Sequence, residues 1–252
     1  SRILPDVVVI GDRTGAVATL RYLNYLHPSV KSIGRTLHYS TMSDNDTSQL
    51  ARDIKEMNGF PCPDVMTIWA PTRYYDAESL PKDIYMLNPR VKLIVALRDP
   101  IVRAKAEHEM ELHCKGNGCA NSNEDGRTFD ERVDASDFNA IKRSLYDVHL
   151  MKWLTLFPRR AMHFVDTNLI LVDPGFELHR VEKYLGLKPF IQRRMFTYNE
   201  TRANMQICGS QMEAVYGHYQ PPVDLETQRR LLNTFAPHVE KLRRIIGHGL
   251  SW

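Results

Sequence analysis

The stretch VVVIGDRTGAVATLRYL, from Val7 to Leu23, restricts the fold more than any other part of the chain. Its first four residues form a continuous apolar run, which is typical of a strand covered on both faces of a parallel sheet. Gly11 and Gly15 bracket a tight turn, and AVATLRYLNYL then has helical periodicity. Many phosphate-binding loops have this order of strand, glycine turn and helix. The turn has no lysine, however, so its anion site is in question.

The same alternation continues downstream. Further strands are predicted at Val65–Trp69, Val91–Pro100 and Ala161–Ile170. The predicted helices are Ile101–Leu112, a long one over Asp137–Phe157 with Asp137 as its cap, Phe176–Leu187 closed at Gly186, and Val223–Ile246 with a bend near Pro237. The pattern predicts a single α/β domain over residues 1–252, with a mostly parallel sheet and helices on both faces. Ligands of such sheets bind at the carboxyl ends of the strands, where the glycine turn and Arg98 would lie.

Composition excludes some classes of partner. Of the 252 residues 43% are hydrophobic and 25% are charged, which suits a globular domain with a substantial core. The net charge of +3 permits an acidic partner. No dense Lys/Arg stripe with interleaved aromatic residues is present, so we expect no nucleic-acid binding. No stretch of 18 apolar residues occurs, so we expect no membrane contact from this chain.

Two of the four cysteines lie close together in a polar loop, HCKGNGCANSNEDG. Cys114 and Cys119 have no histidine at ligand spacing, so a local disulfide is favoured over a zinc site, and free thiols are the alternative. No metal is expected. The pairing of Cys62 and Cys208 stays open.

Two N-glycosylation sequons are present, NDT at Asn45 and NET at Asn199. Together with a disulfide they would place the protein in the secretory pathway, as a glycoprotein of the Golgi lumen or a secreted one.

Four longer segments carry a resemblance to a known family: YMLNPRVKLIVALRDP, AIKRSLYDVHLMKWLTLFP, VDPGFELHRVEKYLGLKPFI and IIGHGLSW. In this order they resemble the heparan sulfate glucosamine 3-O-sulfotransferases, and the likeness covers nearly the whole chain. The resemblance implies the sulfotransferase fold and 3′-phosphoadenosine-5′-phosphosulfate (PAPS) as sulfuryl donor, with PAP as product. It also implies a carboxylate base, a lysine that stabilises charge on the donor, and a heparan sulfate-type glycan as acceptor.

The donor loop departs from the family pattern. The family's lysine-glycine-glycine-threonine-arginine falls on residues 14–18, where this chain has Thr14, Gly15 and then AVA. Only Gly15 is retained. Arg13 is the cation that remains in the turn and is a candidate for the donor phosphates, together with the backbone N–H groups at the start of the helix.

The positions of the catalytic base also depart from the family pattern. The family pattern glutamate-x-histidine-x-x-aspartate falls on Thr36, His38 and Thr41, so both carboxylates are missing. His38 has a suitable ordinary pKa for a general base, although a lone histidine is more often structural.

For the nucleotide, the resemblance implies an arginine at Arg98 and a serine at the position of Ala106, together with Tyr146 in RSLY and Gly217 in GHYQP. The alternatives are a structural Arg-Asp-Pro corner at Arg98 and ordinary helix packing for RSLY. Candidate glycan contacts, with solvated surface cations as the alternative, are His38, Arg35, Arg73, Arg103 and Lys105.

The residues that match the family lie in the scaffold, and those that fail lie where donor and proton would be held. The leading hypothesis is therefore a pseudoenzyme related to the heparan sulfate 3-O-sulfotransferases that binds a glycan or a protein partner. The alternative is an active PAPS-dependent sulfotransferase that uses Arg13, Arg98 and His38. A third hypothesis is a secreted interaction protein that binds no sugar.

Overall fold

The computed structural model describes residues 5–32, 64–71, 79–114, 126–135, 138–200, 204–209 and 223–252. The chain divides into two compact units, each built from two stretches of sequence. Unit 1 is Ser1–Leu97 with Trp153–His218, and unit 2 is Arg98–Lys152 with Tyr219–Trp252. The single domain expected over residues 1–252 stays a prediction, and each unit is described by itself.

Unit 1 contains a parallel sheet of five strands in the order β2-β3-β1-β4-β5, which confirms the predicted α/β class. Every neighbouring pair in it is parallel. The strands are β1 (Val7–Ile10), β2 (Val30–Ser32), β3 (Met66–Trp69), β4 (Lys92–Leu97) and β5 (Met162–Asp166). The four residues of β1 are all buried, as expected for a strand with both faces covered.

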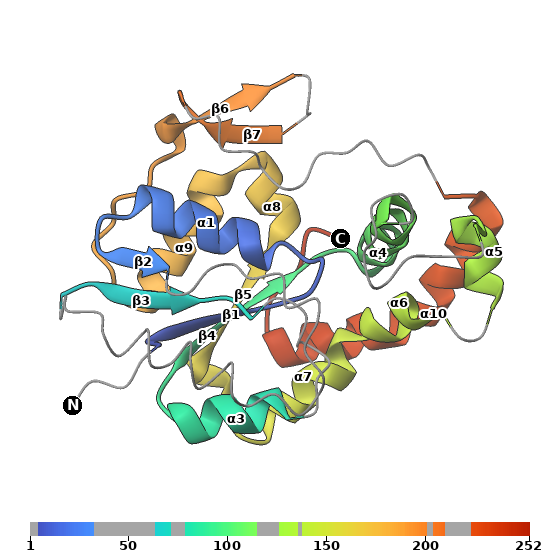
Figure 1. The fold of residues 1–252 in the computed structure, drawn as a ribbon, viewed down its shortest axis with the longest axis horizontal. Helices are drawn as coiled ribbons and strands as arrows, with labels where there is room; N and C mark the ends of the chain where they lie inside the picture. The colour runs from blue at the N-terminus through green and yellow to red at the C-terminus, as the bar shows by residue number, and fades with distance from the viewer. Residues whose placement is uncertain are drawn as a thin grey trace. The chain divides into compact units, whose positions relative to one another are not determined.

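Helices on both sides of the sheet follow the strands in unit 1 (Figure 1). They are α1 (Ala16–Leu26), α3 (Leu80–Leu87), α8 (Thr167–Val172) and α9 (Pro174–Leu185). Two short 3₁₀ turns, η1 (Arg159–Ala161) and η2 (Arg193–Met195), precede strands. A separate antiparallel pair, β6 (Phe196–Asn199) with β7 (Asn204–Ile207), was not predicted.

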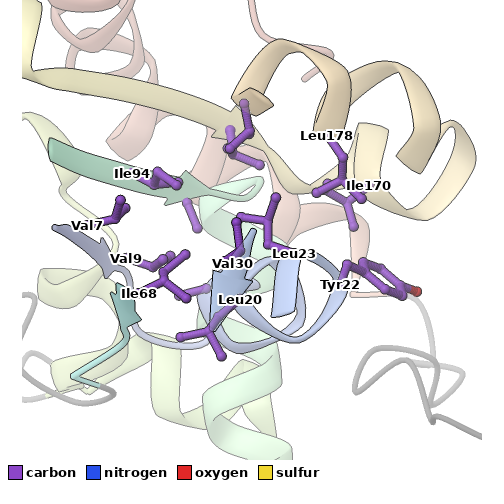
Figure 2. Close-up of a cluster of buried hydrophobic side chains, with 14 of the residues drawn as sticks. Val7, Val9, Leu20, Tyr22, Leu23, Val30, Ile68, Ile94, Ile170 and Leu178 are labelled. Atoms are coloured by element: carbon purple, nitrogen blue, oxygen red, sulfur yellow. The ribbon is translucent and has the colours of Figure 1, made fainter. Parts of the chain in front are cut away.

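The core of unit 1 lies between the sheet and α1, α8 and α9 (Figure 2). Val7 and Val9 of β1 contribute to it, and Leu20 and Leu23 of α1 pack against the same face. These four are the apolar positions from which strand and helix were predicted. The apolar side chains that gave this segment its periodicity are therefore the ones that pack it into the core.

Unit 2 is helical among its described residues. It contains α4 (Pro100–Cys114), α5 (Phe129–Asp134), α6 (Asn139–Arg143), most of α7 (Tyr146–Leu154) and α10 (Leu225–Ile246). Phe129 and Phe138 pack with Leu231 and Phe235 of α10 to form its core. The N-terminus of α5 has a capping box, in which the Thr128 side chain accepts from the backbone of Glu131 and Glu131 reaches back.

Two predicted boundaries were wrong. The helix expected over Asp137–Phe157 is two helices, and Asp137 lies outside the described residues. The carbonyl of Ala140 accepts from the Ser144 Oγ at 2.8 Å and from the Arg103 guanidinium at 3.0 Å, so a side chain from α4 helps to end α6. No local pattern shows such a tertiary donor.

The strand expected over Ala161–Ile170 ends at Asp166, because the Asp166 carboxylate accepts from the Asn168 N–H and caps α8. The C-terminal helix was predicted with a bend near Pro237, and α10 continues through that residue as one helix.

Candidate functional site

The glycine turn has the predicted strand–turn–helix form. It follows β1 and ends where α1 begins, with Gly15 as the N-cap residue of the helix. Gly11, Arg13 and Gly15 all have positive φ, at 148°, 57° and 104°. Arg13 is the unexpected member, because a side chain in this region is strained. The predicted order of strand, glycine turn and helix is therefore present.

Gly15 is required by its neighbour in the protein. A Cβ added there would lie 2.5 Å from the Thr167 Cγ2, in a backbone conformation that already favours glycine. Thr167 is fixed in turn, because its hydroxyl donates to the Leu97 carbonyl at 2.7 Å. Packing between α1, α8 and β4 thus accounts for this glycine without any ligand.

Thr14 occupies the position where the resemblance places the lysine. Thr14 is 1% exposed to solvent, and its Oγ1 is buried without a hydrogen-bond partner in the described part of the chain. The hydroxyl is turned toward Gly11, where a Cβ would lie 2.2 Å from it. Thr14 is uncharged and buried, so it does not supply the positive charge that a lysine would offer to an anion.

Arg13 is the remaining cation of the turn, and it faces a neighbour. Its Nε lies 3.8 Å from a carboxylate oxygen of Asp12. The three positions after Gly15 carry Ala16, Val17 and Ala18, whose side chains have no polar atom. The side chains of residues 14–18 therefore do not fit the phosphosulfate of PAPS, and we derive no catalytic step through it.

The Arg-Asp-Pro corner of unit 2 begins helix α4. The Asp99 carboxylate accepts from the N–H groups of Ile101 and Val102 at 2.8 and 3.2 Å, so it caps the helix. Arg98 is half-buried beside it. Tyr146 is buried near Arg98, and burial raises its pKa, while the charges of Arg103 and Arg98 act in the opposite direction. Arg98 and Tyr146, two predicted contacts of the nucleotide in unit 2, thus lie close together, the first half-buried and the second buried.

The other residues of RSLY are used inside unit 2. Glu107 is buried between two guanidinium groups, that of Arg103 at 2.7 Å and that of Arg143 at 2.6 Å. Ser144 donates to Ala140 and accepts from Arg103 at 3.4 Å. These contacts join α4 to α6, which favours the interpretation of RSLY as helix packing.

Lys105, a candidate glycan contact, is buried in unit 2. Burial lowers the pKa of its ammonium group, and Glu109 and Asp130 partly oppose that shift. Asn199, the acceptor of one sequon, donates from its side-chain amide to the Gln206 Oε1 at 2.9 Å across the β6–β7 pair. Cys208 is exposed and unpaired among the described residues.

Several predicted site residues lie outside the described residues. They are Arg35, Thr36, His38, Asn45, Cys62, Arg73, Cys119 and Gly217. The backbone of Cys114 ends α4, but a bridge to Cys119 stays a prediction. Within the described ranges no three His, Cys, Asp or Glu side chains gather as a metal site. No helix of those ranges is long and apolar enough to cross a membrane.

Comparison with solved structures defines the class of fold. A sulfotransferase from Alicyclobacillus acidocaldarius superposes with a TM-score of 0.70, covering 98% of each chain at 17% sequence identity. The likeness extends over almost the whole chain, so the predicted sulfotransferase fold is confirmed.

The relatives found by sequence belong to a narrower class of sulfotransferase than the similar structures. Heparan sulfate glucosamine 3-O-sulfotransferase 5 of Mus musculus is 29% identical over 99% of this chain and 74% of its own length. Heparan sulfate glucosamine 3-O-sulfotransferase 3B1 of Homo sapiens is 28% identical over 100% of this chain and 66% of its own length. No protein-family model matches the chain. Its homologues are thus heparan sulfate glucosamine 3-O-sulfotransferases, as the resemblance predicted.

Thr167 lies beside the turn and was not among the predicted site residues. It packs on Gly15 although the two residues are far apart in the sequence. A polar pair, Asp166-Thr167, at the end of a predicted strand is the signal that could have found it, because parallel strands bring their carboxyl ends to one edge.

Proposed function

We propose that this chain is a pseudoenzyme related to the heparan sulfate 3-O-sulfotransferases, which binds a glycan without transferring sulfate to it. The observation that carries the proposal is Thr14. The resemblance places a charge-stabilising lysine there, and the residue is a buried threonine whose hydroxyl turns toward Gly11.

The size of the rate contributions that such groups make supports the proposed lack of activity. Preorganised cations and hydrogen-bond donors aimed at developing charge each contribute roughly 10²–10³ to the rate of such reactions. A positioned base contributes about 10²–10⁴. The chain has threonine at the lysine position and at the base position Thr36, and alanine at Ala106 in place of the 3′-site serine. The product of these losses leaves little catalysis.

Glycan binding is supported by the relatives, whose names state heparan sulfate as their substrate, and by the net charge of +3. The sequons at Asn45 and Asn199 support residence in the secretory pathway, in the Golgi lumen or outside the cell. A protein partner instead of a glycan is the outcome expected if no sulfated polysaccharide binds.

A transfer assay tests the proposal. The chain is incubated with PAPS and heparan sulfate, with mouse heparan sulfate glucosamine 3-O-sulfotransferase 5 as the positive control, and the sulfate content of the glycan is measured by mass spectrometry. We expect no added sulfate above the enzyme-free background. Transfer that is lost in His38→Ala and Arg98→Ala variants would contradict the proposal and establish the alternative active mechanism.

A further inference from the structure

A second group of charged side chains lies in unit 1, on helix α9 and the segment that follows it. Phe176, Arg180 and Lys183 recur at positions i, i+4 and i+7 of the helix, so they share one face. Phe176 is 46% exposed and Lys183 is exposed as well. The two acidic residues inside the helix, Glu177 and Glu182, are fully buried on the other side.

The segment after α9 runs back along the helix. The Glu182 carboxylate accepts from the N–H groups of Phe190 and Ile191 at 3.0 and 2.8 Å. At the other end, a Cβ on Gly175 would lie 2.7 Å from the Arg193 Cα. Residues 190–193 therefore follow α9 in the reverse direction over roughly 10 Å, at 1.5 Å per helical residue. Arg193 of this segment consequently lies beside the helix, and the neighbouring cations Lys188 and Arg194 are exposed.

Two of the guanidinium groups are fixed around an aromatic ring. The guanidinium carbons of Arg180 and Arg193 lie 6.0 and 5.8 Å from the centre of the Phe176 ring. Arg180 is also bonded to the Glu177 carboxylate at 2.8 Å, and Arg193 to both oxygens of Asp173 at 3.1 and 2.5 Å. Side chains held in this way lose less entropy on binding than free ones.

The charge of this surface is not cancelled. Lys183, Lys188 and Arg194 are exposed and have no ion pair with any residue that the structure describes. Between residues 173 and 194 the acidic residues are Asp173, Glu177 and Glu182, and Asp173 alone is not fully buried. The solvent-facing side of the segment is thus strongly basic.

We propose that this face is a binding surface for a sulfated polysaccharide. We name it the α9–η2 surface, and its members are Phe176, Arg180, Lys183, Lys188, Arg193 and Arg194. Two adjoining rows of cations complement a chain with sulfates at repeated intervals, and guanidinium groups pair well with such oxyanions. The names of the relatives supply the kind of polymer, heparan sulfate. The inference rests on the glycan binding of the proposed function, whose site it names, and it holds whether or not the chain transfers sulfate.

Charge reversal at two of the three cations without a described ion pair, Lys183 and Arg194, tests the surface. Heparin is the probe, and its dissociation constant is measured by calorimetry at physiological salt. For the K183E/R194E variant we expect the constant to rise about tenfold or more, because two attractive contacts become repulsive.

The matched control reverses two exposed cations of α10 in unit 2, as R229E/K241E, so the net charge changes by the same amount. We expect less than a threefold rise there. Equal losses in both variants would reduce the effect to net charge and overturn the surface, as would no loss in K183E/R194E. Circular dichroism verifies that both variants fold.

Phe176→Leu keeps every charge and removes the ring that positions Arg180 and Arg193. We expect a rise of about threefold in the heparin constant, since weakened cation–π contacts are worth about 0.5–1 kcal/mol. Polyglutamate that competes as well as heparin would overturn the assignment to a sulfated glycan. The same variants enter the transfer assay, so failure of this surface and failure of the pseudoenzyme proposal give separate readouts.

Discussion

The glycine turn of unit 1 and the α4–α6 contact of unit 2 are held together by different kinds of contact. In the turn, Thr14 is buried, and the side chains of Ala16, Val17 and Ala18 carry no polar atom. In the α4–α6 contact, the polar side chains of Arg143 and Ser144 both make hydrogen bonds inside unit 2. Packing within each unit therefore accounts for both regions.

The difference shows that contacts inside the protein are enough to hold both a glycine turn and a polar cluster in place. A glycine such as Gly15 is held by a side chain that fills the space above it, and an arginine such as Arg103 is held by a buried carboxylate. Neither needs a ligand to be kept. We therefore expect substitutions in both regions to change the free energy of unfolding. We expect none of them to create or remove nucleotide binding.

The largest effect is expected at Glu107. Glu107→Gln removes the buried negative charge that lies between the guanidinium groups of Arg103 and Arg143. Breaking a buried pair in this way costs about 3–5 kcal/mol. Urea denaturation measures the loss, and Glu240→Gln, at an exposed pair with Arg244, is the control that should lose nothing measurable. A small loss at Glu107 would mean that the cluster does not hold α4 and α6 together.

At Gly15 the expected loss is next in size. Gly15→Ala combines the strain of a positive φ, about 1–2 kcal/mol, with overpacking against Thr167, about 1–3 kcal/mol. Gly186→Ala is matched to it, since Gly186 has positive φ and no atom within 4 Å of the added Cβ, so it loses the strain alone, about 1 kcal/mol. Equal losses in thermal unfolding would show that Thr167 does not explain the glycine.

At Thr14 we expect a gain in stability. Thr14→Val keeps the shape of the side chain and removes a buried hydroxyl that has no partner among the described residues. Relief of an unsatisfied buried group stabilises the protein by about 1 kcal/mol. A higher thermal midpoint with unchanged heparin affinity supports a packing role. Loss of affinity for PAP in this variant would instead show that the hydroxyl serves an anion.

Lys105 is expected to show the smallest effect. Lys105→Met removes an ammonium group whose charged form is disfavoured by burial, so the free energy of unfolding should change by less than about 1 kcal/mol. Because burial lowers the Lys105 pKa, the contribution of this group to stability rises as the pH rises through the folded-state pKa, and the variant should lack that rise. Weaker heparin binding by Lys105→Met would show that this side chain reaches the glycan.

Local pattern was enough to predict the parallel sheet, β1, α1 and the Gly186 end of α9, because each depends on periodicity or a single capping residue. The break between α6 and α7 could not be predicted, since it involves a donor from Arg103, nearly forty positions away. The same holds for Thr167 over Gly15. For the candidate site, the family resemblance implied which polar side chains the turn lacks, and the structure added that Thr14 is buried and that Ser144 of RSLY is engaged in packing.

The most direct measurement of the central claim is a calorimetric titration of the chain with PAP, the product nucleotide, alongside mouse heparan sulfate glucosamine 3-O-sulfotransferase 5. The account predicts no saturable heat for this chain at nucleotide concentrations up to about 1 mM, which corresponds to binding weaker than about −4 kcal/mol. A micromolar dissociation constant that is lost in the Arg13→Ala and Arg98→Ala variants would contradict it, because the turn and the corner would then hold the nucleotide after all.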